Sequence, residues 1–220
     1  MSISENIIKI KSSIPSNVTL VVVTKTQPIE KLMDVYETGH HIFGENKVQE
    51  MLDKYGQLPK DIEWHLIGHL QSNKVKFIAP FVTLIHSVDS LKLLQEIDKQ
   101  AKKNNRVINC LLQIYIAKEE TKFGLDFTEA KNLLRSDTLK QLKNIKITGL
   151  MGMATNTDNQ EQIAGEFQSL KQFFDLHKHS ETPNIKLETL SMGMSSDYLI
   201  SIKNGSTLIR VGSSIFGNRT

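Results

Sequence analysis

Short apolar runs alternate with amphipathic stretches along most of the chain. Eight runs rich in β-branched and other apolar residues predict strands, over residues 19–25, 40–45, 63–68, 82–88, 107–116, 145–153, 187–195 and 207–212. Apolar positions at helical spacing predict helices between them, including 28–39, 90–105 and 159–179, with an extra helix over 4–13 before the first strand. This alternation is typical of a (β/α)8 TIM barrel, an α/β fold.

The structural rival is a doubly wound open sheet. Such a sheet usually has fewer strands, and no G-x-G-x-x-G fingerprint follows the first predicted strand. The length of 220 residues lies near the lower end for a TIM barrel. We therefore expect one barrel domain over residues 1–220.

Composition excludes several classes of protein. The net charge is only +3 and lysines are interspersed with acids, so no dense basic block predicts a nucleic-acid surface. No apolar run approaches the ~20 residues that span a bilayer, and neither a signal peptide nor an arginine-rich presequence is visible. The single cysteine, Cys110, fits a reducing compartment and is expected to be buried in its apolar run. We expect a cytoplasmic protein, with a mitochondrial pool as the alternative.

The predicted strand ends hold most of the unusual side chains. TIM barrels carry their chemistry at the carboxyl ends of the strands, and here those ends hold Lys25, Glu45, Asn46, His65, His86, Met151, Ser191 and Arg210. Each residue alone has an ordinary structural explanation, such as a helix cap for Asn46 or a hydrogen-bonded core position for His65. His65 and His69 are four residues apart but lack an adjacent acidic ligand, which argues against a metal site.

Two loops of small residues follow the seventh and eighth predicted strands. The first is "LSMGMSSDY" (190–198), and the second lies within "LIRVGSSIFGNR" (208–219). Backbone N–H groups and hydroxyls in such loops can bind an anion, and TIM barrels often bind phosphate after these two strands. Ordinary turn chemistry is the alternative explanation, but two such loops in these places favour phosphate.

Arg210 stands inside the apolar run "TLIRVG", where a guanidinium needs a carboxylate or a ligand acceptor. A lysine can react with an aldehyde, the two loops can bind a phosphate, and an arginine can face a ring nitrogen. Pyridoxal 5′-phosphate (PLP) offers all three partners. On these residues alone, three alternatives stay open. They are a structural ion pair at Arg210, a Schiff-base aldolase with Lys25 beside a phosphate site, and a barrel without a ligand.

Seven segments in this order resemble the signatures of the YggS/PROSC family, the pyridoxal 5′-phosphate homeostasis proteins. They are "VVVTKTQP", "FGENKVQE", "WHLIGHLQSNK", "HSVDS", "GLMGM", "LSMGMSSD" and "IRVGSSIFGNR". The resemblance extends from about residue 18 to the C-terminus. It implies a barrel like the N-terminal domain of bacterial alanine racemase.

The resemblance also implies roles for ten residues. Lys25 is expected to form the Schiff base, and Arg210 is expected to face the pyridine nitrogen. The phosphate is expected to bind Ser191, the backbone of Met192, Gly193, Gly212 and Ser213. Asn46, His65 and Met151 are expected to lie near the ring. Thr24 and Ser213 depart from the usual family residues but keep a hydroxyl, and Lys122 fits a family motif without an assigned role.

The resemblance implies cofactor binding without established turnover. A protonated Arg210 leaves the ring nitrogen largely unprotonated, which weakens the electron sink that carbanion chemistry needs. Alanine racemase has the same partner but takes its opposite base from a second domain, which the expected single domain lacks. We therefore expect a monomeric, non-enzymatic carrier that buffers PLP in vitamin B6 homeostasis or delivers it to PLP-dependent apoenzymes. The alternative is a PLP-dependent amino-acid racemase or decarboxylase whose base comes from a dimer partner.

Overall fold

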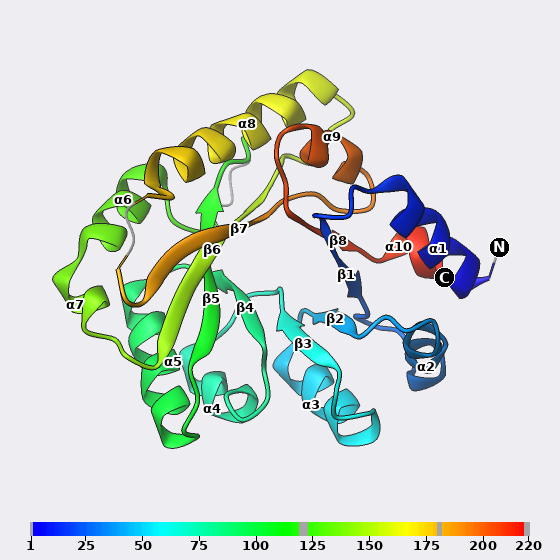
Figure 1. Cartoon of the computed structure of the whole chain (residues 1–220), viewed down its shortest axis with the longest axis horizontal. Helices are drawn as coiled ribbons and strands as arrows, with labels where there is room; N and C mark the ends of the chain where they lie inside the picture. Colours follow the sequence, from blue (N-terminus) through cyan, green and yellow to red (C-terminus); the bar gives the residue numbers. More distant parts are fainter. Residues whose placement is uncertain (1, 119–122, 180–181, 218–220) are drawn as a thin grey trace.

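Eight parallel strands close into a barrel in the order β1 to β8 (Figure 1). The computed structural model describes residues 2–118, 123–179 and 182–217. The strands are β1 Thr19–Val23, β2 Ile42–Glu45, β3 Glu63–Leu66, β4 Leu84–Val88, β5 Ile108–Tyr115, β6 Ile145–Met153, β7 Ile185–Ser191 and β8 Leu208–Val211. Because β1 pairs with both β2 and β8, the sheet has no open edge. The predicted TIM barrel is confirmed, and the open sheet is excluded.

Helices surround the strands (Figure 1). They are α1 Ile3–Ser13, α2 Ile29–Glu37, α3 Val48–Gln57, α4 Val75–Ile78 with the short 3-10 turn η1 Ser72–Lys74, α5 Leu91–Lys103, α6 Phe127–Arg135, α7 Asp137–Lys140, α8 Gln160–His177, α9 Tyr198–Lys203 and α10 Ser213–Phe216. The expected helix before the first strand is α1, which packs beside α10. The Asn6 side-chain amide donates a 2.9 Å hydrogen bond to the Ile215 carbonyl, so the first helix braces the last one.

Local sequence explains where several helices begin. Ser2 and Glu5 form a capping box at α1, and the Ser90 hydroxyl accepts the Leu93 N–H at the start of α5. The helix predicted to begin at Pro28 begins one residue later, and Pro28 is the N-cap of α2. Along α8 the apolar residues at helical spacing, Ile163, Phe167, Leu170 and Phe174, are buried. The caps thus mark where α1 and α5 begin, and the buried face of α8 packs toward the barrel.

The barrel interior is filled by a small cluster that is separate from the larger core between strands and helices. Its buried members are Val21, Leu84, Leu111, Met151 and Leu208. Cys110 is fully buried, as predicted, and burial raises the pKa of its thiol. The barrel interior is therefore packed with apolar side chains beneath the carboxyl ends of the strands.

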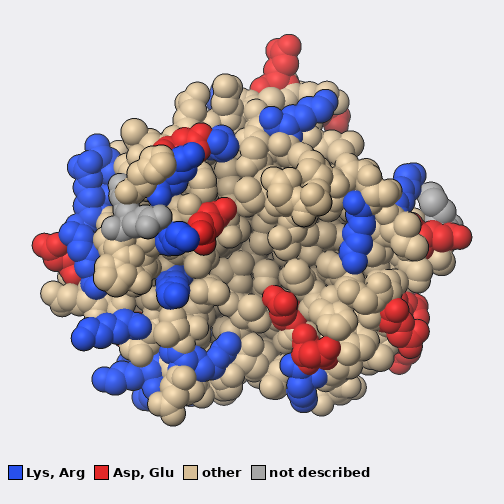
Figure 2. All heavy atoms as spheres, in the orientation of Figure 1, with Lys and Arg blue, Asp and Glu red and all other residues tan. Residues whose placement is uncertain are grey.

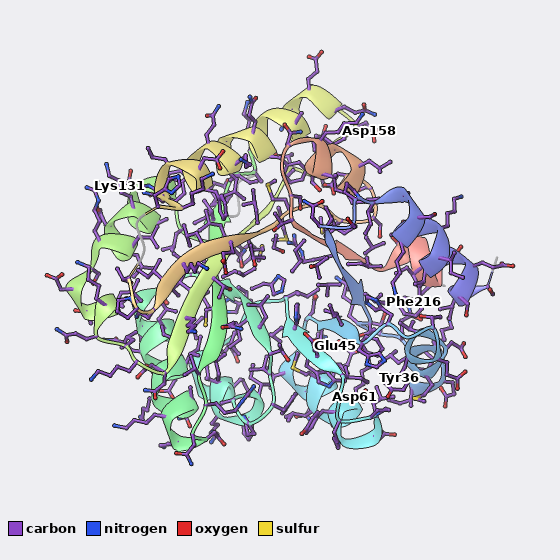
Figure 3. The ribbon with its side chains drawn as sticks, viewed as in Figure 1. Tyr36, Glu45, Asp61, Lys131, Asp158 and Phe216 are labelled. Carbon is purple, nitrogen blue, oxygen red and sulfur yellow. The ribbon has the colours of Figure 1, made fainter. Side chains whose placement is uncertain are left out.

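Charged side chains lie mainly at the periphery of the molecule. In the face shown in Figure 2, Lys and Arg gather on the side that carries α5, α6 and α7, and the centre is largely uncharged. Lys131 and Asp158 lie at the outer edge, whereas Glu45 lies inside, close to β2 and β3 (Figure 3). Over the described part of the chain, no helix has the length and apolarity to cross a membrane.

Candidate functional site

A cavity of about 490 Å³ opens where the barrel strands end. Its lining comes from the ends of β1, β2, β3, β6, β7 and β8 or the loops after them: Val23, Lys25, Gln27, Asn46, Ile67, Met153, Met194, Ser195, Ser196, Arg210, Gly212, Ser213, Phe216 and Gly217. Five of the ten predicted site residues are in this lining: Lys25, Asn46, Arg210, Gly212 and Ser213. The cavity thus lies at the end of the barrel where the sequence predicts chemistry.

Lys25 stands on a tight turn directly after β1. The Gln27 N–H donates to the Thr24 carbonyl at 3.1 Å, so Lys25 and Thr26 are the two central residues of the turn. Thr26 has a φ of +64°, a left-handed value that this turn position usually reserves for glycine. The turn places the half-buried Lys25 side chain at the cavity.

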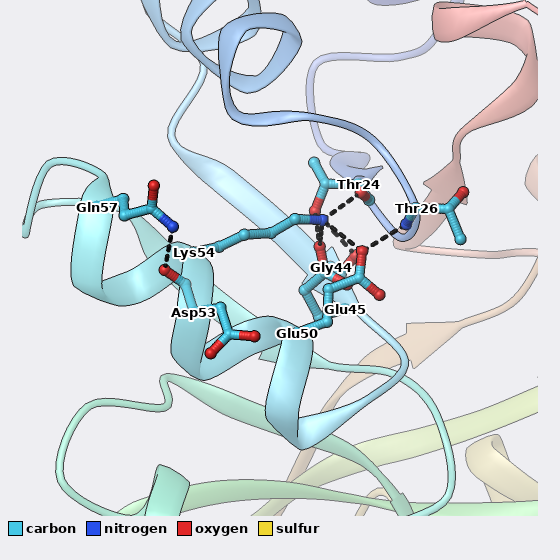
Figure 4. Close-up of polar contacts among 8 residues, drawn as sticks. All are labelled: Thr24, Thr26, Gly44, Glu45, Glu50, Asp53, Lys54 and Gln57. Atoms are coloured by element: carbon cyan, nitrogen blue, oxygen red, sulfur yellow. Dashed lines mark hydrogen bonds and ion pairs between the residues drawn. The ribbon is translucent and has the colours of Figure 1, made fainter.

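A charge network lies directly under this turn (Figure 4), with Lys54 and Glu45 buried and Glu50 partly exposed. Lys54 Nζ donates to the Thr24 carbonyl at 2.7 Å, to Glu45 Oε1 at 2.6 Å and to Glu50 Oε1 at 2.7 Å. Glu50 Oε1 also accepts the Thr26 N–H at 2.5 Å. Burial raises the pKa of Glu45, opposed by its bonds to Lys54 and Thr24. The sequence points to Glu45 as a strand-end residue but gives no sign of Lys54.

Arg210 is nearly fully buried, and it is among the residues that line the cavity. It donates to the Ser191 carbonyl at 2.9 Å, to Ser191 Oγ at 2.5 Å and to the Gly152 carbonyl at 3.1 Å. These acceptors are carbonyl groups and a hydroxyl. Burial lowers the pKa of Arg210 to about 10, opposed by the negative charge of Asp197, so the guanidinium stays protonated at neutral pH. A residue with a fixed positive charge therefore belongs to the cavity wall.

Two buried histidines continue the chain of hydrogen bonds from Arg210 into the barrel. Ser191 Oγ lies 3.1 Å from His86 Nδ1, and His86 Nε2 lies 3.1 Å from His65 Nδ1. Burial lowers the pKa of His65 to about 3 and holds the pKa of His86 well below its usual 6.5. His65 thus lies behind Ser191 and His86, and the cavity lining does not include it.

The histidine pair predicts an acid-sensitive fold. Below pH ~6.5 the histidines bind protons in the unfolded chain but not in the folded chain. As the pH is lowered, the free energy of unfolding should therefore decrease, and the decrease due to His65 should continue down to about pH 3. Each histidine contributes at most about 1.4 kcal/mol per pH unit. Urea unfolding at pH 7.5 and pH 5 measures the effect. His86→Gln should reduce the pH slope, whereas His179→Gln, at an exposed position, should not; equal slopes in all three proteins would contradict the prediction.

The two predicted anion loops meet beside the cavity. Ser195 Oγ, after β7, accepts the Gly212 N–H at 3.2 Å and the Ser214 N–H at 3.4 Å, after β8. The Gly212 and Ser214 N–H groups thus both donate to an oxygen atom of a residue that lines the cavity. Gly193 has a φ of +91°, and a Cβ there would stand 2.1 Å from Ser201 Oγ, so only glycine fits this bend.

The other predicted residues lie behind the lining. Ser191, Met192 and Met151 are buried, and the Met192 N–H donates to the Leu208 carbonyl at 3.1 Å. Lys122 lies outside the described residues. The lining residues absent from the predicted set, such as Gln27 and Ile67, are of ordinary types, and only their places after strand ends could have pointed to them.

The donor set fits an anionic aldehyde. The cavity gathers a primary amine, a fixed guanidinium, hydroxyls, and N–H groups already bonded to an oxygen. Among the residues that the structure describes, no group of three or more His, Cys, Asp or Glu side chains is arranged to hold a metal ion. Fold and site together define a barrel protein with a lysine-bearing pocket whose donors suit a small anion.

Comparisons with known proteins agree with this class. The family model for the N-terminal domain of alanine racemase matches residues 1–220. The pyridoxal phosphate homeostasis protein of Aquifex aeolicus is 40% identical, over 89% of this chain and 85% of its own length. The corresponding protein of Schizosaccharomyces pombe is 39% identical, over 92% and 85%. The chain belongs to the family of pyridoxal phosphate homeostasis proteins, which confirms the resemblance in its sequence.

Solved structures support the same placement. PipY of Synechococcus elongatus PCC7942, solved without PLP, is 34% identical with a TM-score of 0.92, over 98% of this chain and 100% of that chain. The PLP-bound form of PipY has a TM-score of 0.88. Alanine racemase of Clostridium difficile 630 has a TM-score of 0.79 at 13% identity, over 99% of this chain and 56% of that chain. The racemase likeness shows the shared fold alone.

Proposed function

We propose that this chain binds pyridoxal 5′-phosphate as a Schiff base to Lys25 and serves intracellular vitamin B6 homeostasis by buffering or delivering the cofactor. The observation that carries the proposal is the single cavity that brings Lys25, Arg210 and the loop at Gly212 together. When bound, PLP supplies an aldehyde that a lysine amine captures reversibly. The names of the relatives and the PLP-bound PipY structure support the same ligand.

Each predicted residue then has a task that suits its place. Gly212 and Ser213 would hold the phosphate, with Ser191, Met192 and Gly193 supporting the loop from behind. Arg210 would face the ring nitrogen, and Asn46 would lie beside the ring. Met151 and His65 would shape the floor from inside the barrel, where both are buried.

The proposal includes no catalytic turnover. Arg210 keeps its proton at neutral pH, so a ring nitrogen facing it would stay largely unprotonated. The cofactor would then be a weaker electron sink for carbanion chemistry, and the described cavity lining includes no Asp, Glu, His or Tyr side chain to act as an opposite base. We propose that the protein acts as a monomer and that PLP-dependent apoenzymes receive the cofactor.

Titration with PLP tests the binding. The purified protein should develop the visible absorbance band of a pyridoxal imine. Borohydride reduction followed by peptide mapping should then find one PLP per chain, attached to Lys25. Mixing the loaded protein with a PLP-dependent apoenzyme should restore that enzyme's activity. A protein that stays colourless with added PLP would contradict the proposal.

The alternative function is a PLP-dependent amino-acid racemase or decarboxylase, which the alanine racemase fold favours. Steady-state assays of the PLP-loaded protein with L- and D-amino acids separate the two functions. We expect no turnover above that of free PLP, and sustained turnover would replace the carrier role with an enzymatic one.

A further inference from the structure

The turn that carries Lys25 holds an unfavourable backbone conformation. Among the described residues outside glycine, only Thr26 and Asn105 have a positive φ. Asn105 follows the end of α5, where Asn commonly adopts this conformation. Thr26 is β-branched, and a positive φ in such a residue is a genuine outlier that the surroundings must stabilise.

Two side chains of α3 supply that stabilisation. The peptide group before Lys25 is anchored through the Thr24 carbonyl, which accepts from Lys54 Nζ at 2.7 Å. The peptide group after Lys25 is anchored through the Thr26 N–H, which donates to Glu50 Oε1 at 2.5 Å. Fixing the peptide planes on both sides of a residue fixes its φ and ψ. The direction in which the Lys25 side chain leaves the backbone is thereby set by α3.

The anchors themselves are held firmly. Glu50 and Lys54 are four residues apart on α3, and their side chains pair at 2.7 Å. Lys54 also pairs at 2.6 Å with Glu45, which is fully buried at the end of β2. The network therefore joins α3, β2 and the Lys25 turn (Figure 4).

We propose that Glu50 is a positioning residue that orients Lys25 for reaction with an aldehyde. Glu50 acts through the Thr26 N–H. The inference rests on the proposed function for the identity of the aldehyde, whereas the arrangement of the turn stands independently of it. A lysine whose backbone is held in place loses less conformational freedom when it reacts, and small misplacements of a reacting group can cost orders of magnitude in rate.

Three variants test this role. Glu50→Ala removes the acceptor, Glu50→Gln keeps an oxygen acceptor without its charge, and Asp53→Ala is the matched control. Asp53 is an exposed carboxylate on the same helix, and its side chain bonds to Gln49 at 3.0 Å. The measurements are the rate and equilibrium constant of the visible PLP band, thermal unfolding, and amide exchange of Thr26 without ligand.

In Glu50→Ala we expect the rate constant and the equilibrium constant for formation of the visible PLP band each to fall about tenfold. Thr26 exchange should become faster, while thermal unfolding changes little because Lys54 keeps its pair with Glu45. Glu50→Gln should recover part of the loss, and Asp53→Ala should match the wild type. A rise in exchange without a change in PLP binding would show that the contact is only structural and overturn the inference.

The two proposals fail in different ways. If the wild type forms the band and Glu50→Ala forms it with the same rate and constant, the positioning role falls and the proposed function stands. A wild type that forms no band overturns the proposed function, and the positioning role falls with it.

Discussion

Replacing Lys25 with Ala should abolish the visible PLP band while leaving the barrel folded. The Schiff base needs a primary amine, and Lys25 is the one lysine in the lining formed by the described residues. Its side chain is half-buried at the barrel mouth, and its turn is held by backbone contacts from α3. The free energy of unfolding should therefore change by no more than about 1 kcal/mol. Absorbance titration and urea unfolding measure the two effects.

A matched lysine makes this result specific. Lys47 is exposed just before α3, and Lys47→Ala should form the band with the wild-type affinity. Borohydride reduction and peptide mapping should then locate PLP on Lys25 in the wild type and in Lys47→Ala. A full band in Lys25→Ala would show that another amine is used.

Non-covalent binding should survive in part without Lys25. Arg210 and the loop at Gly212 still line the same cavity, so under the proposed function they would still contact the ring and the phosphate. The lysine would then act as a reversible tether added to an anion site. This division of labour suits a protein that must release its ligand, because breaking the imine leaves only the weaker contacts.

The strands are predictable because buried parallel strands are short, nearly continuous apolar runs. The sequence predicts β6 over 145–153, and the structure has the same bounds. The expected strand over 187–195 instead ends at Ser191, because Gly193 turns the chain at φ +91°. Such ends depend on contacts between distant segments, which the local pattern does not contain.

The site is predictable where a residue type is unusual for its place. Arg210 in an apolar strand and the Ser-Gly loops stand out in this way. Lys54 does not, because a lysine four residues after Glu50 resembles an ordinary surface pair on a helix. Only the closed barrel places Lys54 against Glu45 and under the Lys25 turn.

Replacing Lys54 with Met should lower the free energy of unfolding by about 3–5 kcal/mol, as expected when one partner of a buried ion pair is removed. The Lys54 and Glu45 side chains are only 6% and 0% exposed. Glu45 Oε2 has no hydrogen-bond partner among the described residues, so the carboxylate depends on what Lys54 and Thr24 give to Oε1. Urea unfolding at pH 8 measures the loss, and Lys47→Met, at an exposed position, is the control.

Two further measurements test whether this loss of stability comes from the buried Glu45 carboxylate that Lys54→Met leaves without its cation. Burial raises the pKa of Glu45 and its bond to Lys54 opposes that rise, so the pKa should climb further in Lys54→Met. If the pKa of Glu45 is higher in the folded chain than in the unfolded chain, the folded chain takes up a proton first as the pH falls, and this stabilises the fold. The difference in the free energy of unfolding between Lys54→Met and the wild type should therefore be smaller at pH 5 than at pH 8. Adding Glu45→Gln to Lys54→Met removes the buried charge and should recover much of the loss. A deficit that is independent of pH and unchanged by Glu45→Gln would mean that Lys54 stabilises the barrel by packing and not by neutralising Glu45.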